Sequence, residues 1–177
     1  PKLFVSVKTR LGKSAHTNYR TSMIRGLIFD LDGTLVDSLP GIATALNHAL
    51  DDIKLPNHPQ DVVETFIGDG LLNLITRALG PDHFNQQDEL LSAFQKHYSE
   101  DWKHGTSPYP GVTSLLEELH QNNIPMAVLS NKPHGYTVEI VETLFPQNLF
   151  SQIRGHRDGY PKKPDPTTAH QIISDWN

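Results

Sequence analysis

The stretch from Ile24 to Phe29 most constrains how this chain can fold, because its apolar and β-branched side chains favour an extended backbone. It ends at Asp30, Asp32 and Gly33. An apolar strand that stops at acidic residues and a glycine is typical of an open α/β sheet, whose ligand crevice lies at the strand ends. We therefore expect a buried strand with a functional site directly after it.

Asp30 and Asp32 are two residues apart, so on a strand their side chains point the same way. Two carboxylates this close repel each other unless a cation or a shared proton lies between them. Oxygen ligands of this kind suit Mg²⁺, with one carboxylate left to react. An acidic turn that caps a helix is the simpler interpretation of so short a motif, but two later motifs favour the metal site.

A second apolar run, Ile124 to Leu129, predicts a neighbouring strand, and Ser130 and Asn131 follow it. A hydroxyl and free backbone N–H groups at such a strand end can hold phosphate oxygens. Taken alone, Ser-Asn after a strand is ordinary turn chemistry. Together with the acidic pair, it indicates a phosphate site.

A lysine loop forms the third motif. In Lys162-Lys163-Pro164, the proline restricts Lys163 to an extended backbone, so the loop holds this lysine rigidly. An ammonium group fixed there can pair with a carboxylate and with a phosphoryl group. Lys163 fits this position better than Lys162, and a solvated basic turn is the interpretation of such a loop on its own.

These three motifs, the run from Phe29 to Ser38, Ser130-Asn131 and Lys163-Pro164-Asp165-Pro166, resemble the haloacid dehalogenase-like phosphatases, and among them the phosphoglycolate phosphatase group. The resemblance covers residues 23–177. It implies that Asp30 is the nucleophile that becomes an aspartyl phosphate and that Asp32 is the general acid and base. It also implies that Lys163 pairs with Asp30 and with the transferred phosphoryl group.

The same resemblance implies the ligand sites. Thr34, Ser130 and Asn131 would bind the phosphate group. Mg²⁺ would be the cofactor, held by Asp30 and by Asp32, the latter through its main-chain carbonyl. The expected partner is a small phosphorylated metabolite, with 2-phosphoglycolate the first substrate to consider. Such a dianionic ester repels a carboxylate nucleophile, so charge neutralisation and positioning matter more than a strong base.

More than ninety residues separate Asp30 from Ile124, too many for a simple crossover, so a second unit is inserted there. Apolar residues recur in it at helical spacing in three runs: Ile42 to Ile53, Ile67 to Leu79 and Leu90 to Trp102. Shorter patterns then predict helices over Val112 to Leu119 and His134 to Leu144 and a third strand over Gln152 to Gly155. The turn Gly68-Asp69-Gly70 joins two of the inserted helices, or else it faces the substrate.

The expected fold is α/β, a doubly wound parallel Rossmann-like sheet, incomplete here, with an inserted α-helical cap. The domains are a basic N-terminal extension (1–22), the catalytic core (23–36 and 109–177) and the cap (37–108). By resemblance, the cap closes over the active site and hinges where it leaves and rejoins the core.

In the family that the motifs resemble, a fourth motif, an acidic pair after a later strand, completes the magnesium site. The sequence reaches Asn177 without it, and Asp175 is not assigned to the metal, so we expect a fragment of a longer protein or a crippled product. A phosphomutase of the same superfamily is the closest alternative function. A catalytically impaired phosphate-binding or interaction protein is another, whereas a dehalogenase is disfavoured because Asp32 provides a phosphatase-type acid and base.

Charge and composition limit the partners. The first 25 residues carry six basic and no acidic residues, and the rest carries nine basic and twenty acidic, which argues against a nucleic-acid surface on the catalytic part. No apolar run has transmembrane length. The absence of cysteine fits a reducing compartment, so we expect a cytoplasmic protein, although the basic N-terminal segment also has the composition of an organelle-targeting peptide. The oligomeric state stays open.

Overall fold

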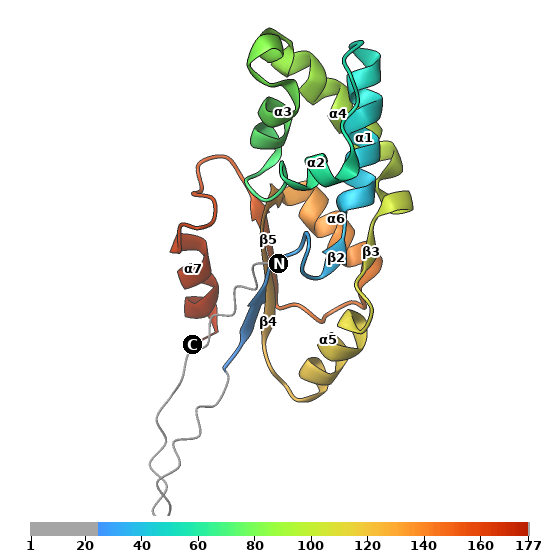
Figure 1. Cartoon of the computed structure of the whole chain (residues 1–177). Helices are drawn as coiled ribbons and strands as arrows, with labels where there is room; N and C mark the ends of the chain where they lie inside the picture. The colour runs from blue at the N-terminus through green and yellow to red at the C-terminus, as the bar shows by residue number, and fades with distance from the viewer. Residues whose placement is uncertain (1–24, 177) are drawn as a thin grey trace, which may run out of the picture.

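The computed structural model describes residues 25–176 and has an α/β fold. Its parallel sheet contains β1 (Leu27–Phe29), β4 (Met126–Pro133) and β5 (Gln152–His156), in the order β1-β4-β5 (Figure 1). These are the strands that the sequence predicts, and their parallel direction brings their carboxyl ends to one edge of the sheet. The expected N-terminal extension, residues 1–22, lies outside the described residues.

Helices cover both faces of the sheet, as expected for a doubly wound fold. The helices α5 (Val112–Gln121) and α6 (His134–Leu144) lie on one face, and α7 (Thr167–Asp175) lies on the other (Figure 1). Alternate strand residues serve the two faces. Ile28, Ala127 and Leu129 pack against Ile172 of α7, whereas the strand residues between them join the core that contains α5 and α6.

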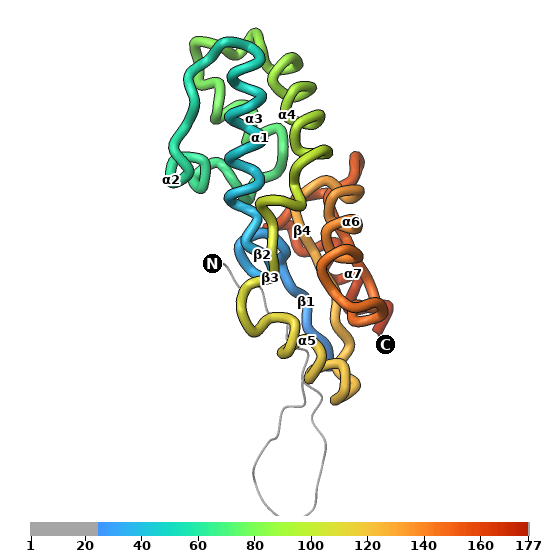
Figure 2. Tube along the Cα trace, turned by 90° about the vertical axis from the view of Figure 1, so that its right-hand side faces the viewer, coloured from blue at the N-terminus to red at the C-terminus, as the bar shows by residue number. Residues whose placement is uncertain are grey.

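A helical insertion joins β1 to α5. It contains α1 (Leu39–Asp52), α2 (Gln60–Glu64), α3 (Leu71–Leu79), the 3₁₀ helix η1 (Pro81–Gln86), α4 (Gln87–Asp101) and the 3₁₀ helix η2 (Trp102–Gly105). A two-stranded antiparallel ribbon of β2 (Val36–Asp37) and β3 (Ser107–Pro108) forms its base. Figure 2 shows the insertion stacked at one end of the sheet, so it stands over the strand ends.

The periodicity of the sequence predicts α1 and α4 well, but the prediction of a helix from Ile67 is wrong at its start. The helix α3 begins only at Leu71. Gly68 and Gly70 have φ angles of 112° and 92°, outside the helical region, so residues 67–70 form a turn instead. The short helix α2 was not predicted from the spacing.

The insertion has a buried interior that is continuous with the core between the sheet and its helices. Its largest fully buried side chains are Trp102, Tyr98, Leu46, Leu50, Ile75 and Leu90. Burying a large apolar side chain contributes roughly 1.5–3 kcal/mol. At the base, a Cβ atom on Gly105 would lie 2.4 Å from the main-chain nitrogen of Gly41, so the two ends of the insertion approach each other more closely than side chains would allow.

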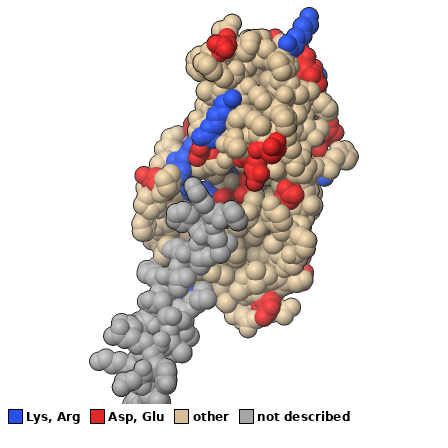
Figure 3. Space-filling model, viewed as in Figure 1, with Lys and Arg blue, Asp and Glu red and all other residues tan. Residues whose placement is uncertain are grey.

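None of the helices in residues 25–176 is long and apolar enough to cross a membrane. On the face shown in Figure 3, acidic and basic side chains meet near the middle of the molecule, where the insertion adjoins the sheet.

Candidate active site

The candidate site lies where the strand ends of the sheet meet the insertion. Asp30 directly follows β1, and Asp32 lies in the turn after it. Ser130 and Asn131 lie within β4, which continues to Pro133 instead of ending at Leu129 as the sequence suggested. The pairing of β4 with β5 shifts its register between Leu129 and Pro133, the segment that carries Ser130, Asn131 and Lys132.

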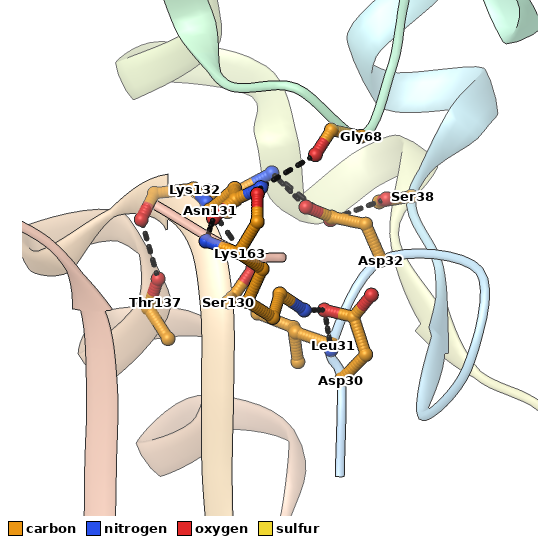
Figure 4. Close-up of polar contacts among 10 residues, drawn as sticks. All are labelled: Asp30, Leu31, Asp32, Ser38, Gly68, Ser130, Asn131, Lys132, Thr137 and Lys163. Carbon is orange, nitrogen blue, oxygen red and sulfur yellow. Dashed lines mark hydrogen bonds and ion pairs between the residues drawn. The ribbon is translucent and has the colours of Figure 1, made fainter. Parts of the chain in front are cut away.

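Asp30 forms an ion pair with Lys163. The Nζ atom of Lys163 lies 2.6 Å from Oδ1 of Asp30, and the main-chain N–H of Leu31 donates to the same oxygen at 2.8 Å (Figure 4). The neighbouring Lys162 points elsewhere, because its Nζ atom lies close to Gly70 of the insertion. Of the two lysines that the loop offers, Lys163 is therefore the one next to Asp30.

The side chain of Asn131 fixes the lysine loop in place. Its Oδ1 atom accepts a hydrogen bond from the main-chain N–H of Lys163 at 2.8 Å, and its Nδ2 atom donates to the carbonyl of Lys163 at 3.1 Å. Nδ2 also donates to the carbonyl of Gly68 at 3.0 Å (Figure 4). The amide thus links β4, the lysine loop and the insertion. The turn Gly68-Asp69-Gly70 joins α2 to α3, as predicted, and its Gly68 also lies against the site.

Asp32 is held by a different pair of groups. The hydroxyl of Ser38 donates to Oδ1 of Asp32 at 2.6 Å, and Nζ of Lys132 lies 3.0 Å from Oδ1 and 3.4 Å from Oδ2. The side chains of Lys132 and Asp32 are 7% and 13% exposed, so this ion pair is shielded from water. Asp30 and Asp32 thus face different lysines (Figure 4).

Lys132 remains charged despite its burial. Burial lowers its pKa, but the negative charge of Asp32 and the contact with Tyr98 more than offset this effect, so the net pKa is raised above the ordinary value for lysine. The Nζ atom also lies 4.9 Å from the centre of the Tyr98 ring, within the range of a cation–π interaction. No role was predicted for Lys132, although the sequence carries a signal for one: Lys132 lies two residues after Ser130 at the end of an apolar strand.

Ser130 and Thr34 lie beside these charged groups. Ser130 is buried, and its Oγ atom accepts a hydrogen bond from the main-chain N–H of Lys132 at 3.2 Å. Thr34 lies in the turn after β1, whose N–H groups converge on the carbonyl of Leu31. Thr34 lines a wide cleft together with Asp30 and Lys163, so the structure brings all the predicted site residues to one region.

A partly open cavity extends from these groups into the insertion. Its floor contains Asp30, Asp32, Ser130, Asn131 and Lys132, and its walls are largely apolar side chains of the insertion, including Ile42, Leu71, Leu74, Phe94 and Tyr98. A ligand bound at the floor would therefore be partly removed from water.

The oxygen donors at the strand ends fit a magnesium ion. Residues 25–176 contain no cluster of three or more His, Cys, Asp or Glu side chains able to share a metal ion. Mg²⁺ does not require one, because it usually keeps several waters and binds one or two carboxylates together with substrate phosphate. The carboxylate of Asp30 and the main-chain carbonyl of Asp32 are donors of this kind.

Known proteins of one family are similar to this chain in sequence. A family model described as haloacid dehalogenase-like hydrolase matches residues 27–177. The chain is 36% identical over 154 residues to a phosphoglycolate phosphatase of Yersinia pestis, and the match covers 85% of this chain and 66% of that protein. It is 37% identical over 150 residues to a phosphoglycolate phosphatase of Aquifex aeolicus, covering 85% and 69% of the two chains.

Solved structures share the fold. A crystal structure of a predicted phosphoglycolate phosphatase from Haemophilus somnus matches with a TM-score of 0.75 and 29% identity, over 86% of this chain and 71% of that one. A Lactobacillus delbrueckii protein matches with a TM-score of 0.78 and 26% identity, over 85% and 72%. The chain thus spans about two thirds of the length of the proteins that it resembles.

Proposed function

We propose that this chain, which belongs to the haloacid dehalogenase-like hydrolases, carries the catalytic site of a Mg²⁺-dependent phosphatase acting on a small phosphorylated metabolite. The observation that carries the proposal is the contact between Asp30 and Lys163, 2.6 Å apart in a cleft at the strand ends. A carboxylate beside a fixed ammonium group is the arrangement that nucleophilic attack on a dianionic phosphate requires, because the cation reduces the repulsion between the two anions.

In the first step, an oxygen of Asp30 attacks the phosphorus atom of the substrate. The bond between phosphorus and the leaving oxygen breaks, a new bond joins phosphorus to Asp30, and Asp32 gives its proton to the leaving oxygen. The products of this step are the alcohol and an aspartyl phosphate at Asp30. Lys163, together with the hydroxyl of Ser130 and main-chain N–H groups, would stabilise the charge on the phosphoryl oxygens.

In the second step, water attacks the phosphorus atom of the aspartyl phosphate. Asp32, now ionised, accepts a proton from this water, and inorganic phosphate leaves as the carboxylate of Asp30 is restored. Proton transfer to and from Asp32 requires that its carboxyl group face the reacting oxygens in both steps. Its contacts with Ser38 and Lys132 hold it at the cavity floor that it shares with Asp30.

Mg²⁺ would be held by the carboxylate of Asp30 and the main-chain carbonyl of Asp32, and it would supply further neutralisation of the phosphate charge. The helical insertion would act as a cap, because its apolar walls complete the cavity above the two carboxylates. Its two-stranded base, β2 and β3, is where opening and closing would take place.

The first substrate to test is 2-phosphoglycolate, because the relatives from Yersinia pestis and Aquifex aeolicus are phosphoglycolate phosphatases. Purified protein should release inorganic phosphate from it, lose that activity with a chelator and recover it with added Mg²⁺. Transfer of the phosphoryl group to an added sugar phosphate, with no phosphate released, would identify a phosphomutase. Phosphate binding without turnover of any phosphomonoester would identify a binding protein and refute the proposal.

A further inference from the structure

We infer that Lys132 is a positioning residue that holds the carboxyl group of Asp32 toward the leaving oxygen of the substrate. The inference rests on the proposed phosphatase function, and it assigns to Lys132 a role different from that of Lys163. Each lysine lies next to one carboxylate: Lys163 beside Asp30, and Lys132 beside Asp32.

The contacts to Asp32 leave one of its oxygens available for proton exchange. Ser38 donates to Oδ1 at 2.6 Å, and the ammonium group of Lys132 makes its shorter contact, 3.0 Å, with the same atom. Oδ2 receives only the longer contact of 3.4 Å from Lys132. Two donors on one oxygen fix the orientation of the carboxyl group, so the other oxygen is the natural site for the transferred proton.

Lys132 is itself held firmly enough to act as a support. Lys132 is buried, and its Nζ atom lies 4.9 Å from the centre of the Tyr98 ring of α4. The hydroxyl of Thr137 donates to the main-chain carbonyl of Lys132 at 3.2 Å, which ties the end of β4 to α6. A lysine with both its backbone and its ammonium group constrained has little freedom to leave Asp32.

Asp32 lies three residues beyond Phe29, the last residue of β1, and its main chain bridges to Val36. This bridge fixes the backbone, whereas the orientation of the carboxyl group depends on its contacts with Ser38 and Lys132. Proton transfer needs the donor and acceptor atoms within about 2.6–3.2 Å. A misplacement of about 1 Å can reduce the rate about 10²-fold. Loss of Lys132 should therefore impair proton transfer more than it impairs phosphate binding.

The experiment compares two substrates that differ in their need for a proton. An alkyl phosphate releases a strongly basic alkoxide unless Asp32 protonates it, whereas p-nitrophenyl phosphate releases a stable phenolate that needs little protonation. The ratio kcat/KM reports the reaction only through departure of this leaving group. Lys132→Met should reduce kcat/KM for the alkyl phosphate by about 10- to 100-fold and that for p-nitrophenyl phosphate only slightly.

Lys96→Met is the matched control, because it removes the same charge from an exposed lysine of α4 that does not line the cavity with Asp32. This control should not change kcat/KM for either substrate by more than the measurement error. An equal loss on both substrates in Lys132→Met, or no loss on either, would overturn the inference. A wild-type protein inactive on both substrates would instead refute the proposed phosphatase function, and the inference with it.

A second comparison covers the case in which Lys132→Met leaves the carboxylate of Asp32 buried without a partner and the protein unfolds. Asp32→Asn with Lys132→Met removes both charges and is compared with Asp32→Asn alone. If Lys132 acts through Asp32, adding Lys132→Met to Asp32→Asn should change kcat/KM for the alkyl phosphate very little. A further loss of about tenfold or more would show that Lys132 contacts the substrate itself and would contradict the positioning role.

Discussion

The ammonium group of Lys132 lies 3.0 Å from the carboxylate of Asp32, although one hundred residues separate the two in the sequence. This ion pair joins the end of β4 to the turn after β1, and the ring of Tyr98, from the insertion, contacts the ammonium group of Lys132. Because Lys163 contacts Asp30 across the same cavity floor, the two carboxylates are supported independently. The predictions below separate their contributions.

Asp32→Asn should reduce single-turnover phosphoryl transfer by about 10²- to 10⁴-fold, the usual contribution of a general acid or base. The amide retains the main-chain carbonyl that would contact Mg²⁺ but cannot donate the carboxylic proton. Rapid-quench measurement of the first turnover checks this. A loss of only a few fold would mean that Asp32 has another role.

Asp30→Asn should lower steady-state turnover by roughly 10⁴-fold or more, in the range seen when a catalytic nucleophile is removed. An amide is neither a competent nucleophile nor an anionic ligand. Asp61→Asn is a suitable control, since Asp61 is exposed in α2. Mass spectrometry of acid-quenched wild-type protein should find the phosphoryl group on the peptide that contains Asp30, and a phosphoryl group on another residue would contradict the assignment.

The neighbouring lysines Lys162 and Lys163 provide a matched pair. Lys163→Met removes the ammonium group 2.6 Å from Asp30 and should reduce kcat by about 10²- to 10³-fold, comparable to the loss of an electrostatic stabiliser in other enzymes. Lys162→Met removes the same charge one residue earlier, where the side chain points toward Gly70. Steady-state kinetics of both variants decides the matter, and similar losses in the two would show that only the overall charge of the loop counts.

Most of the fold could be predicted from local patterns. The strands β1 and β4 follow apolar runs, and α1 and α4 follow helical periodicity, because each of these segments buries one face or both faces against the core. The parallel order also follows, since long connections separate the strands. The helix α3 began later than predicted because two glycines with positive φ replace its first turn.

The site could be predicted only in part. Asp30 and Ser130 follow apolar runs, and Lys163 directly precedes a proline, features that a sequence displays directly. The contacts of Lys132 and Asn131 depend instead on where segments far apart in the chain come together. Asn131 contacts Gly68 and Lys163, which lie 63 and 32 residues away, so no local pattern could show that its amide supports the lysine loop.

Gly105→Ala should destabilise the protein, because the new Cβ atom would lie 2.4 Å from the main chain of Gly41, where neither segment has a flexible side chain to move. Overpacking of this kind typically costs ~1–3 kcal/mol. Gly135→Ala is the matched control: Gly135 lies in α6 with no atom close to its Cβ position, and the change should stabilise by up to ~1 kcal/mol. Urea unfolding of both variants measures the difference, and equal effects would contradict the close approach.

The pKa of His134 provides a test of the charge around β5. Burial is the largest cause that lowers this pKa below its ordinary value, and the nearby guanidinium groups of Arg157 and Arg154 lower it further. The main-chain N–H of Gly155 donates to Nδ1 at 3.2 Å, which requires that this nitrogen carry no proton.

Protonation of His134 is therefore disfavoured in the folded protein. The contribution of this group to the free energy of unfolding is fully present above the pKa of His134 in the unfolded chain, and it is lost as the pH falls through the lower pKa in the folded protein. Arg157→Gln should raise the midpoint of His134, measured by NMR of its ring protons between about pH 5 and 8, whereas Lys96→Gln, on the exposed surface of α4, should not. The same Arg157 variant should lose less unfolding free energy than the wild type over the acidic half of that range. An unchanged midpoint in Arg157→Gln would mean that burial and Arg154 lower the pKa of His134 without a measurable contribution from Arg157.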